Sequence, residues 1–167
     1  MKGGPLQKLV VLSVVWAVFA ACAPVTGCKR PFGSSREEQD FLGAVQDGDL
    51  QAAREFVRRS VNVNARTDDG CAFGPLHIAV LKKPSNLAMV DFLVTHGADL
   101  DLRDSLGKTP LHYAATQRDD VDIVEFLLAH GADPHAVDQL GHSPLDVAQA
   151  MGCEQAIKAM RKYISSK

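Results

Sequence analysis

The histidines are the side chains of this sequence best suited to bind a metal or to transfer a proton near neutral pH. Four of them recur in two pairs: His77 and His112 each follow a leucine, and His96 and His130 each precede Gly-Ala-Asp. A metal site needs ligands that converge on one point and are oriented by further hydrogen bonds, whereas residues that recur at a fixed spacing form rows. We therefore interpret these four histidines as structural, and no metal site is predicted.

The remaining residues carry no catalytic motif. Gly-x-Ser-x-Gly, His-Glu-x-x-His and a phosphate-cradling glycine loop are all absent from the sequence. Asp99 and Asp133 recur in register, as the histidines do, which favours a role in turns over a role as catalytic carboxylates. We therefore predict that the protein is not an enzyme and that it uses no cofactor.

These residues belong to a repeating unit that runs from Asp104 to Asp133. Thr109 can cap a helix by accepting a backbone N–H, and Pro110 suits the first helical position because the donor it lacks would be unsatisfied there. A short helix with small apolar residues follows, and then a bulkier one that ends at Gly131. Neither helix can bury its apolar face alone, so the unit requires neighbouring copies.

The sequence supplies those copies. Gly-Pro-Leu-His at 74–77 and Ser-Pro-Leu-Asp at 143–146 match Thr-Pro-Leu-His at 109–112, and a degraded copy occupies 41–64. A period of about 33 residues with Thr-Pro-Leu-His-x-Ala resembles the ankyrin-repeat family. The resemblance implies an all-α solenoid of about four helix-turn-helix repeats with β-turn or hairpin loops. The expected domain covers 35–167, with repeats at approximately 35–66, 67–103, 104–137 and 138–163.

The resemblance also implies that the turn tips and the first helix of each pair form a concave face that binds other proteins. Leu106 and Leu140 occupy matching positions one repeat apart, and we expect Phe73, in a turn two residues longer, to lie beside them. Exposed apolar groups with a polar rim are typical of binding hot spots. The alternative is that these side chains fold back onto the neighbouring turn. The predicted protein-binding residues are Asp69, Phe73, Leu106, Lys108, Thr116, Gln117, Leu140 and His142.

The N-terminus predicts export. Two lysines precede an uncharged apolar run at 9–21, which has the length of a signal-peptide core and is too short to span a bilayer comfortably. Small residues before Cys22 resemble a bacterial lipobox, although Phe19 replaces the leucine usual three positions before the cysteine. We predict a signal peptide over 1–21, lipid attachment at Cys22 and a flexible linker over 22–34. Ordinary cleavage after Ala21 or Ala23 is the alternative.

Such a protein would be periplasmic and membrane-anchored by its lipid, and Ala23 after the cysteine favours the outer membrane. Export to an oxidising compartment raises the question of disulfides. Cys71 and Cys153 lie two repeats apart, too far for a bond to each other, so a bridge from Cys28 to either one and reduced thiols both remain open.

The net charge of the chain limits the kinds of molecule that it is expected to bind. Removal of residues 1–21 takes away two lysines and no acids, and it leaves 16 basic and 20 acidic side chains, a net charge of −4. This balance argues against nucleic-acid binding. We therefore predict a monomeric, lipid-anchored protein–protein interaction scaffold of a bacterial envelope, with an unidentified protein partner. The alternative is an inhibitor or immunity-type protein that blocks a secreted enzyme.

Overall fold

The computed structural model describes residues 35–82, 86–117 and 121–166. In these residues the chain folds into pairs of helices that follow one another in a row. The prediction of an all-α fold with about four repeats is confirmed for these residues. The pairs are α2 (Arg36–Asp47) with α3 (Leu50–Arg58), α4 (Pro75–Leu81) with α5 (Leu87–Thr95), α6 (Pro110–Ala114) with α7 (Val121–Ala129), and α8 (Pro144–Met151) with α9 (Glu154–Ser165).

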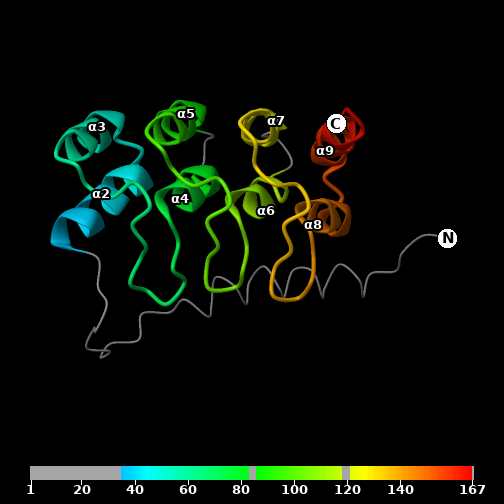
Figure 1. The fold of residues 1–167 in the computed structure, drawn as a ribbon, viewed down its shortest axis with the longest axis horizontal. Coiled ribbons are helices and arrows are strands. Elements are labelled where there is room, and N and C mark those ends of the chain that lie inside the picture. Colours follow the sequence, from blue (N-terminus) through cyan, green and yellow to red (C-terminus); the bar gives the residue numbers. More distant parts are fainter. Residues whose placement is uncertain (1–34, 83–85, 118–120, 167) are drawn as a thin grey trace. The chain divides into compact units, whose positions relative to one another are not determined.

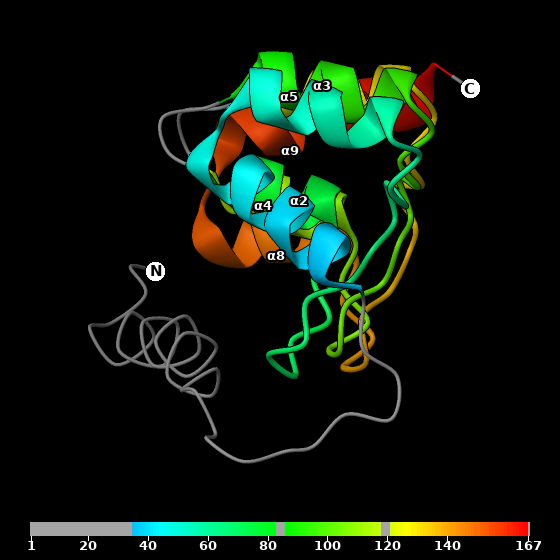
Figure 2. The same cartoon turned by 90° about the vertical axis from the view of Figure 1, so that its left-hand side faces the viewer.

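The helices form two layers. The first helices of the pairs lie side by side in one layer and the second helices in the other (Figure 1). Between successive pairs the chain projects away from both layers as hairpin loops (Figure 2). We call these loops the first hairpin (59–74), the second hairpin (96–109) and the third hairpin (130–143).

Helix starts follow the sequence pattern with one difference. Pro75, Pro110 and Pro144 each occupy the first helical position, as expected. Ser35 forms the capping box that the pattern Ser-x-x-Glu indicates at the start of α2. The difference is at Thr109, whose side chain accepts no backbone N–H; its hydroxyl lies 2.9 Å from Nδ1 of His112 instead. The histidine ring replaces the capping hydrogen bond because it reaches back over the helix start.

The core lies between the two layers and continues from pair to pair. Leu76 and Leu111 of the repeated motif are buried, and so are the apolar residues of α7 that face inward. The terminal helix pairs carry exposed charged side chains: Glu37 and Arg59 form an exposed ion pair in the first pair, and Lys158 and Arg161 are exposed on α9. A repeat array needs such polar end surfaces to stay soluble.

The predicted signal peptide, the lipid site at Cys22, the linker and Cys28 lie outside the described residues. Among the helices that the structure describes, none combines the length and the apolar character that crossing a membrane requires.

Candidate protein-binding surface

Buried carboxylates hold the tips of the second and third hairpins. Asp104 Oδ1 accepts the backbone N–H groups of Leu106 and Lys108, each at 2.8 Å. Asp138 Oδ1 accepts those of Leu140 and His142, each at 2.9 Å. Charge-assisted hydrogen bonds of this kind are stronger than neutral ones. The two tips are therefore rigid before any partner arrives.

The first hairpin is longer than the others, as the sequence indicates. Its base closes by a bond from the N–H of Thr67 to the carbonyl of Phe73, whereas the second hairpin closes from Asp104 to Lys108. The loop is therefore two residues longer. Asp69, a predicted binding residue, is exposed and accepts hydrogen bonds from the Thr67 hydroxyl and the Cys71 N–H. Asp69 therefore stabilises the turn in which it lies.

The structure corrects the expected place of Phe73 beside Leu106. The carbonyl of Phe73 closes its hairpin as that of Lys108 does, so Phe73 corresponds to Lys108. Its half-buried ring packs against His77 and Tyr113, with centroids 5.8 Å and 5.6 Å away. The alternative of a side chain folded back onto its neighbours therefore describes Phe73.

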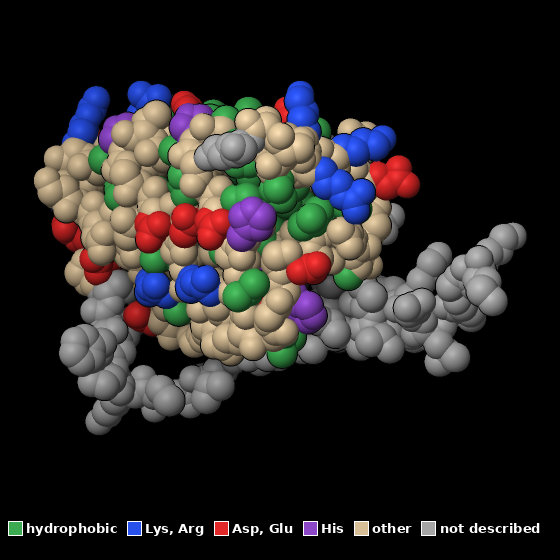
Figure 3. All heavy atoms as spheres, turned by 45° about the vertical axis from the view of Figure 1, so that its right-hand side comes forward, with side chains coloured by type: hydrophobic (Ala, Val, Ile, Leu, Met, Phe, Trp, Pro, Cys, Tyr) green, Lys and Arg blue, Asp and Glu red, His purple; other side chains and the backbone are tan. Residues whose placement is uncertain are grey.

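Leucines at the tips of the second and third hairpins do reach the surface. Ser105 N–H donates to the Cys71 carbonyl and Gln139 N–H donates to the Leu106 carbonyl, so Cys71, Leu106 and Leu140 stand in one row. Their exposed fractions rise along the row from 6% to 39% and 76%. Figure 3 shows hydrophobic side chains at the lower edge of the molecule, the level of the hairpins in Figure 1. Leu106 and Leu140 are thus an exposed apolar pair.

Polar predicted residues flank this pair. Lys108 Nζ lies 5.8 Å from the centroid of the Tyr113 ring, and His142 is exposed with its Nδ1 3.8 Å from Asp138 Oδ1. Thr116 and Gln117 are half-buried at the end of α6 rather than on a hairpin tip. The six predicted residues other than Phe73 and Asp69 therefore divide between the hairpin tips and the helix layer.

The histidine rows are structural, as predicted. His77 Nδ1 accepts the N–H of Gly74 at 3.2 Å, and its Nε2–H donates to the Lys108 carbonyl at 3.1 Å. His112 makes the same two bonds in the next repeat. Its Nδ1 accepts the N–H of Thr109 at 3.0 Å, and its Nε2–H donates to the His142 carbonyl at 3.0 Å. Burial lowers the pKa of both imidazoles below the ordinary value, which keeps them neutral and able to accept at Nδ1.

The second histidine row packs against aromatic rings. His96 lies with its ring centroid 4.3 Å from that of Phe92, and His130 lies 4.0 Å from Phe126. Across the described residues, no group of three or more His, Cys, Asp or Glu side chains is placed to hold a metal ion.

Two arginines that we did not single out from the sequence tie the hairpins together. Arg66 Nη1 donates to the Arg103 carbonyl and Arg103 Nη1 donates to the Val137 carbonyl, both at 2.6 Å. Each thus bonds the backbone of the next hairpin. The signal was available: Arg66 follows Asn62 by four residues, and Arg103 follows Asp99 by four. Val137 takes the same place in the third hairpin and is 45% exposed.

Replacement of Arg103 by alanine is expected to lower the free energy of unfolding by about 1–2 kcal/mol, because the Val137 carbonyl loses a charge-assisted hydrogen bond. Urea unfolding followed by circular dichroism measures the change. Arg161→Ala, at an exposed position on α9, is the control and should change stability by less than about 0.5 kcal/mol. Equal effects of the two substitutions would contradict this role of Arg103.

Comparison with known proteins places the repeats in a family. A family model described as ankyrin repeats (3 copies) matches residues 41–138. Protein phosphatase 1 regulatory subunit 27 of Mus musculus is 42% identical over 77 residues, which are 46% of this chain and 47% of the relative, and the Homo sapiens protein gives the same values. The 2-5A-dependent ribonuclease of Mus musculus is 31% identical over 81 residues, 48% of this chain and 11% of the relative. The alignments with the phosphatase subunits thus cover about half the length of those proteins.

Proposed function

The chain belongs to the ankyrin-repeat family, and on this premise we propose that it is a non-enzymatic scaffold that binds a protein partner through the tips of its hairpins. One observation carries the proposal. Leu106 and Leu140 are exposed on tips that are already fixed by Asp104 and Asp138. A rigid apolar surface gives affinity because little conformational entropy is lost when the partner binds.

The polar surroundings of the leucines support the same proposal. Lys108 and His142 flank the two leucines, and apolar anchors surrounded by polar residues dominate the energy of many protein interfaces. The concave side between the hairpins and the first helices would add contacts from Thr116 and Gln117. The exposed Asp69 would extend the surface along the first hairpin.

We also propose that the protein acts outside the cytoplasm, anchored to a bacterial envelope membrane by lipid on Cys22. Support comes from the apolar run at 9–21 and from the small residues before Cys22. Mass spectrometry of the mature protein tests this: an N-terminal acylated Cys22 is expected, and a chain that still begins at Met1 would contradict it.

A second candidate function is regulation of an enzyme by a bound scaffold. The observation that favours it is the 42% identity to a protein named as a regulatory subunit of protein phosphatase 1. The inhibitor or immunity-type alternative is of the same kind, since both partners would be enzymes. Binding of purified protein phosphatase 1 catalytic subunit, measured by interferometry with the full-length chain, tests this candidate directly.

The hairpin proposal predicts the result of a capture experiment with envelope extract. The full-length protein should retain a specific partner, and the double variant Leu106→Asp, Leu140→Asp should weaken its binding by at least about 100-fold, since buried anchors each contribute about 2 kcal/mol or more. Leu87→Asp is the matched control, because Leu87 is 38% exposed, close to the 39% of Leu106, but begins α5 rather than a hairpin tip.

Circular dichroism should first show that all variants are folded. If the double variant and Leu87→Asp bind the partner as tightly as the parent, the hairpin tips are not the binding surface. If Leu87→Asp loses binding as fully as the double variant, the partner instead contacts the outer helices. Only selective loss in the double variant supports the proposal.

A further inference from the structure

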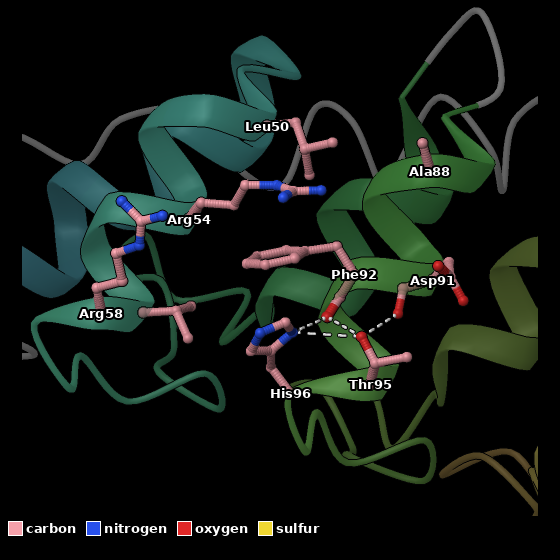
Figure 4. A pocket seen from close by; sticks show the side chains of 9 residues that line it. Leu50, Arg54, Arg58, Ala88, Asp91, Phe92, Thr95 and His96 are labelled. Carbon is pink, nitrogen blue, oxygen red and sulfur yellow. Dashed lines mark hydrogen bonds between the residues drawn. The ribbon is translucent and has the colours of Figure 1, made fainter.

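A groove between two outer helices lies away from the hairpins and has its own chemistry. It runs between α3 and α5, with a volume of about 550 Å³ (Figure 4). Its lining residues on α3 recur at helical spacing, so one stripe of that helix faces the groove. The half-buried side chains of Leu50 and Val57 and the buried ring of Phe92 give it an apolar lining.

Arginines supply the charge on one side of the groove. The guanidinium carbon of Arg54 lies 5.7 Å from the centroid of the Phe92 ring, so its cation is held against the aromatic face. Arg54 is exposed and forms no ion pair within the part of the chain that the structure describes. Among the residues that the structure describes, Arg58, one turn further along α3, pairs only with Glu55, in an exposed contact at 3.5 Å. Both guanidinium groups are available to an anion.

Comparison between repeats shows that this charge belongs to the first groove. Val61 N–H donates to Phe56 O, and Ala98 N–H donates to Leu93 O at the corresponding helix end. In this register Arg54 of α3 is equivalent to Asp91 of α5, and Glu125 is the equivalent residue of α7. The position that carries a cation on α3 therefore carries an acid on both α5 and α7.

We propose that the α3–α5 groove binds an acidic peptide segment, in which a carboxylate pairs with Arg54 and Arg58 and a neighbouring apolar side chain packs against the half-buried Leu50 and Val57. Arginine suits this role because its planar fork can bind a carboxylate through two hydrogen bonds. Because Asp91 also lines the groove and offsets part of the arginine charge, a ligand with a single carboxylate is favoured over a densely charged anion such as a phosphate or nucleic acid. This groove is separate from the hairpin tips, and its proposed ligand does not depend on binding at the tips.

The test is selection of random twelve-residue peptides displayed on phage against the full-length protein, with Arg54→Glu protein as the counter-selection. The expected sequences contain Asp or Glu beside an aromatic residue or leucine. One enriched peptide, made synthetically, should bind the parent and lose at least about 10-fold in affinity with Arg54→Glu, as expected for a directly contacting charge. Arg161→Glu makes the same charge change on α9 and should alter affinity by less than about twofold, because screening weakens distant charges.

The outcomes separate this site from the hairpin tips. A peptide that binds the Leu106→Asp, Leu140→Asp variant as well as the parent, but not Arg54→Glu, supports the groove whether or not the hairpin proposal holds. Selection that enriches no peptide over bare beads overturns the inference. So do enriched peptides without acidic residues, and peptides that bind the Arg54→Glu and parent proteins equally.

Discussion

Replacement of His112 by alanine is expected to lower the free energy of unfolding by about 3 kcal/mol. The imidazole is 1% exposed and bonds two backbone groups, the N–H of Thr109 and the carbonyl of His142. Both would lose this partner in a water-poor interior, at a cost of about 1–3 kcal/mol for each unsatisfied group. A cavity would add to the loss. Because the bond to His142 joins successive hairpins, the third hairpin should also become less ordered.

Urea unfolding at pH 7.5, where neutral histidine predominates, measures this effect. His135→Ala is the control, since His135 is exposed in the same hairpin, and it should change stability by less than about 0.5 kcal/mol. Hydrogen exchange should show faster exchange in the third hairpin for His112→Ala. A loss below about 1 kcal/mol would mean that water or a neighbouring side chain satisfies both backbone groups and that the row contributes little.

Acidification is expected to have the second large effect. His77 and His112 have pKa values lowered from the ordinary 6.5, chiefly by burial, so the folded protein binds fewer protons than the unfolded chain below that pH. Stability is then unchanged by these groups above about pH 6.5 and falls as the pH drops below it. The slope reaches up to about 1.4 kcal/mol per pH unit for each histidine.

The neighbouring charges modify this slope but do not reverse it. Asp104 favours protonated His77 and Asp138 favours protonated His112, but the loss of hydration on burial outweighs them. Asp146 has a pKa lowered chiefly by the Ser143 hydroxyl, so it adds a loss only below about its ordinary 3.8. The range from pH 5 to 7 therefore separates the histidines from this carboxyl.

Urea unfolding at half-unit steps of pH between 5 and 7.5 checks the prediction. The parent should lose stability below pH 6.5, and His112→Gln, which does not titrate, should lose less over the same range. A substitution of exposed His135 by glutamine should leave the slope close to that of the parent. Equal slopes in all three proteins would show that the buried imidazoles do not cause the acid sensitivity.

The repeat pattern could be recognised in the sequence because each copy is defined by residues that lie close together along the chain. Thr-Pro-Leu-His recurs with the same spacing, and each copy places a proline where only a terminal helical N–H is lost and a leucine where the core begins. The same local reasoning gave the structural histidines and the two extra residues of the first hairpin. The histidines were identified by their recurrence alone, although the bond from His77 to the Lys108 carbonyl joins neighbouring repeats.

Errors and omissions arose where residues from different repeats meet. Phe73 was expected beside Leu106, but the hairpin hydrogen bonds place it in register with Lys108, and its ring finds Tyr113 of the next repeat. Arg66 and Arg103 recur in register, but the sequence does not show what they bind, because their partners are backbone carbonyls of the next hairpin.

By itself, the sequence determined that the chain forms helix pairs in register, because helix caps and apolar spacing act within a few residues. Only the tertiary structure decided which side chains remain at the surface. Cys71, Leu106 and Leu140 stand in one row, yet their exposed fractions range from 6% to 76%. It also decided that Arg54 faces Phe92 across a groove, since the register between α3 and α5 comes from packing. Surface and charge therefore depend on contacts between repeats, which a local pattern does not contain.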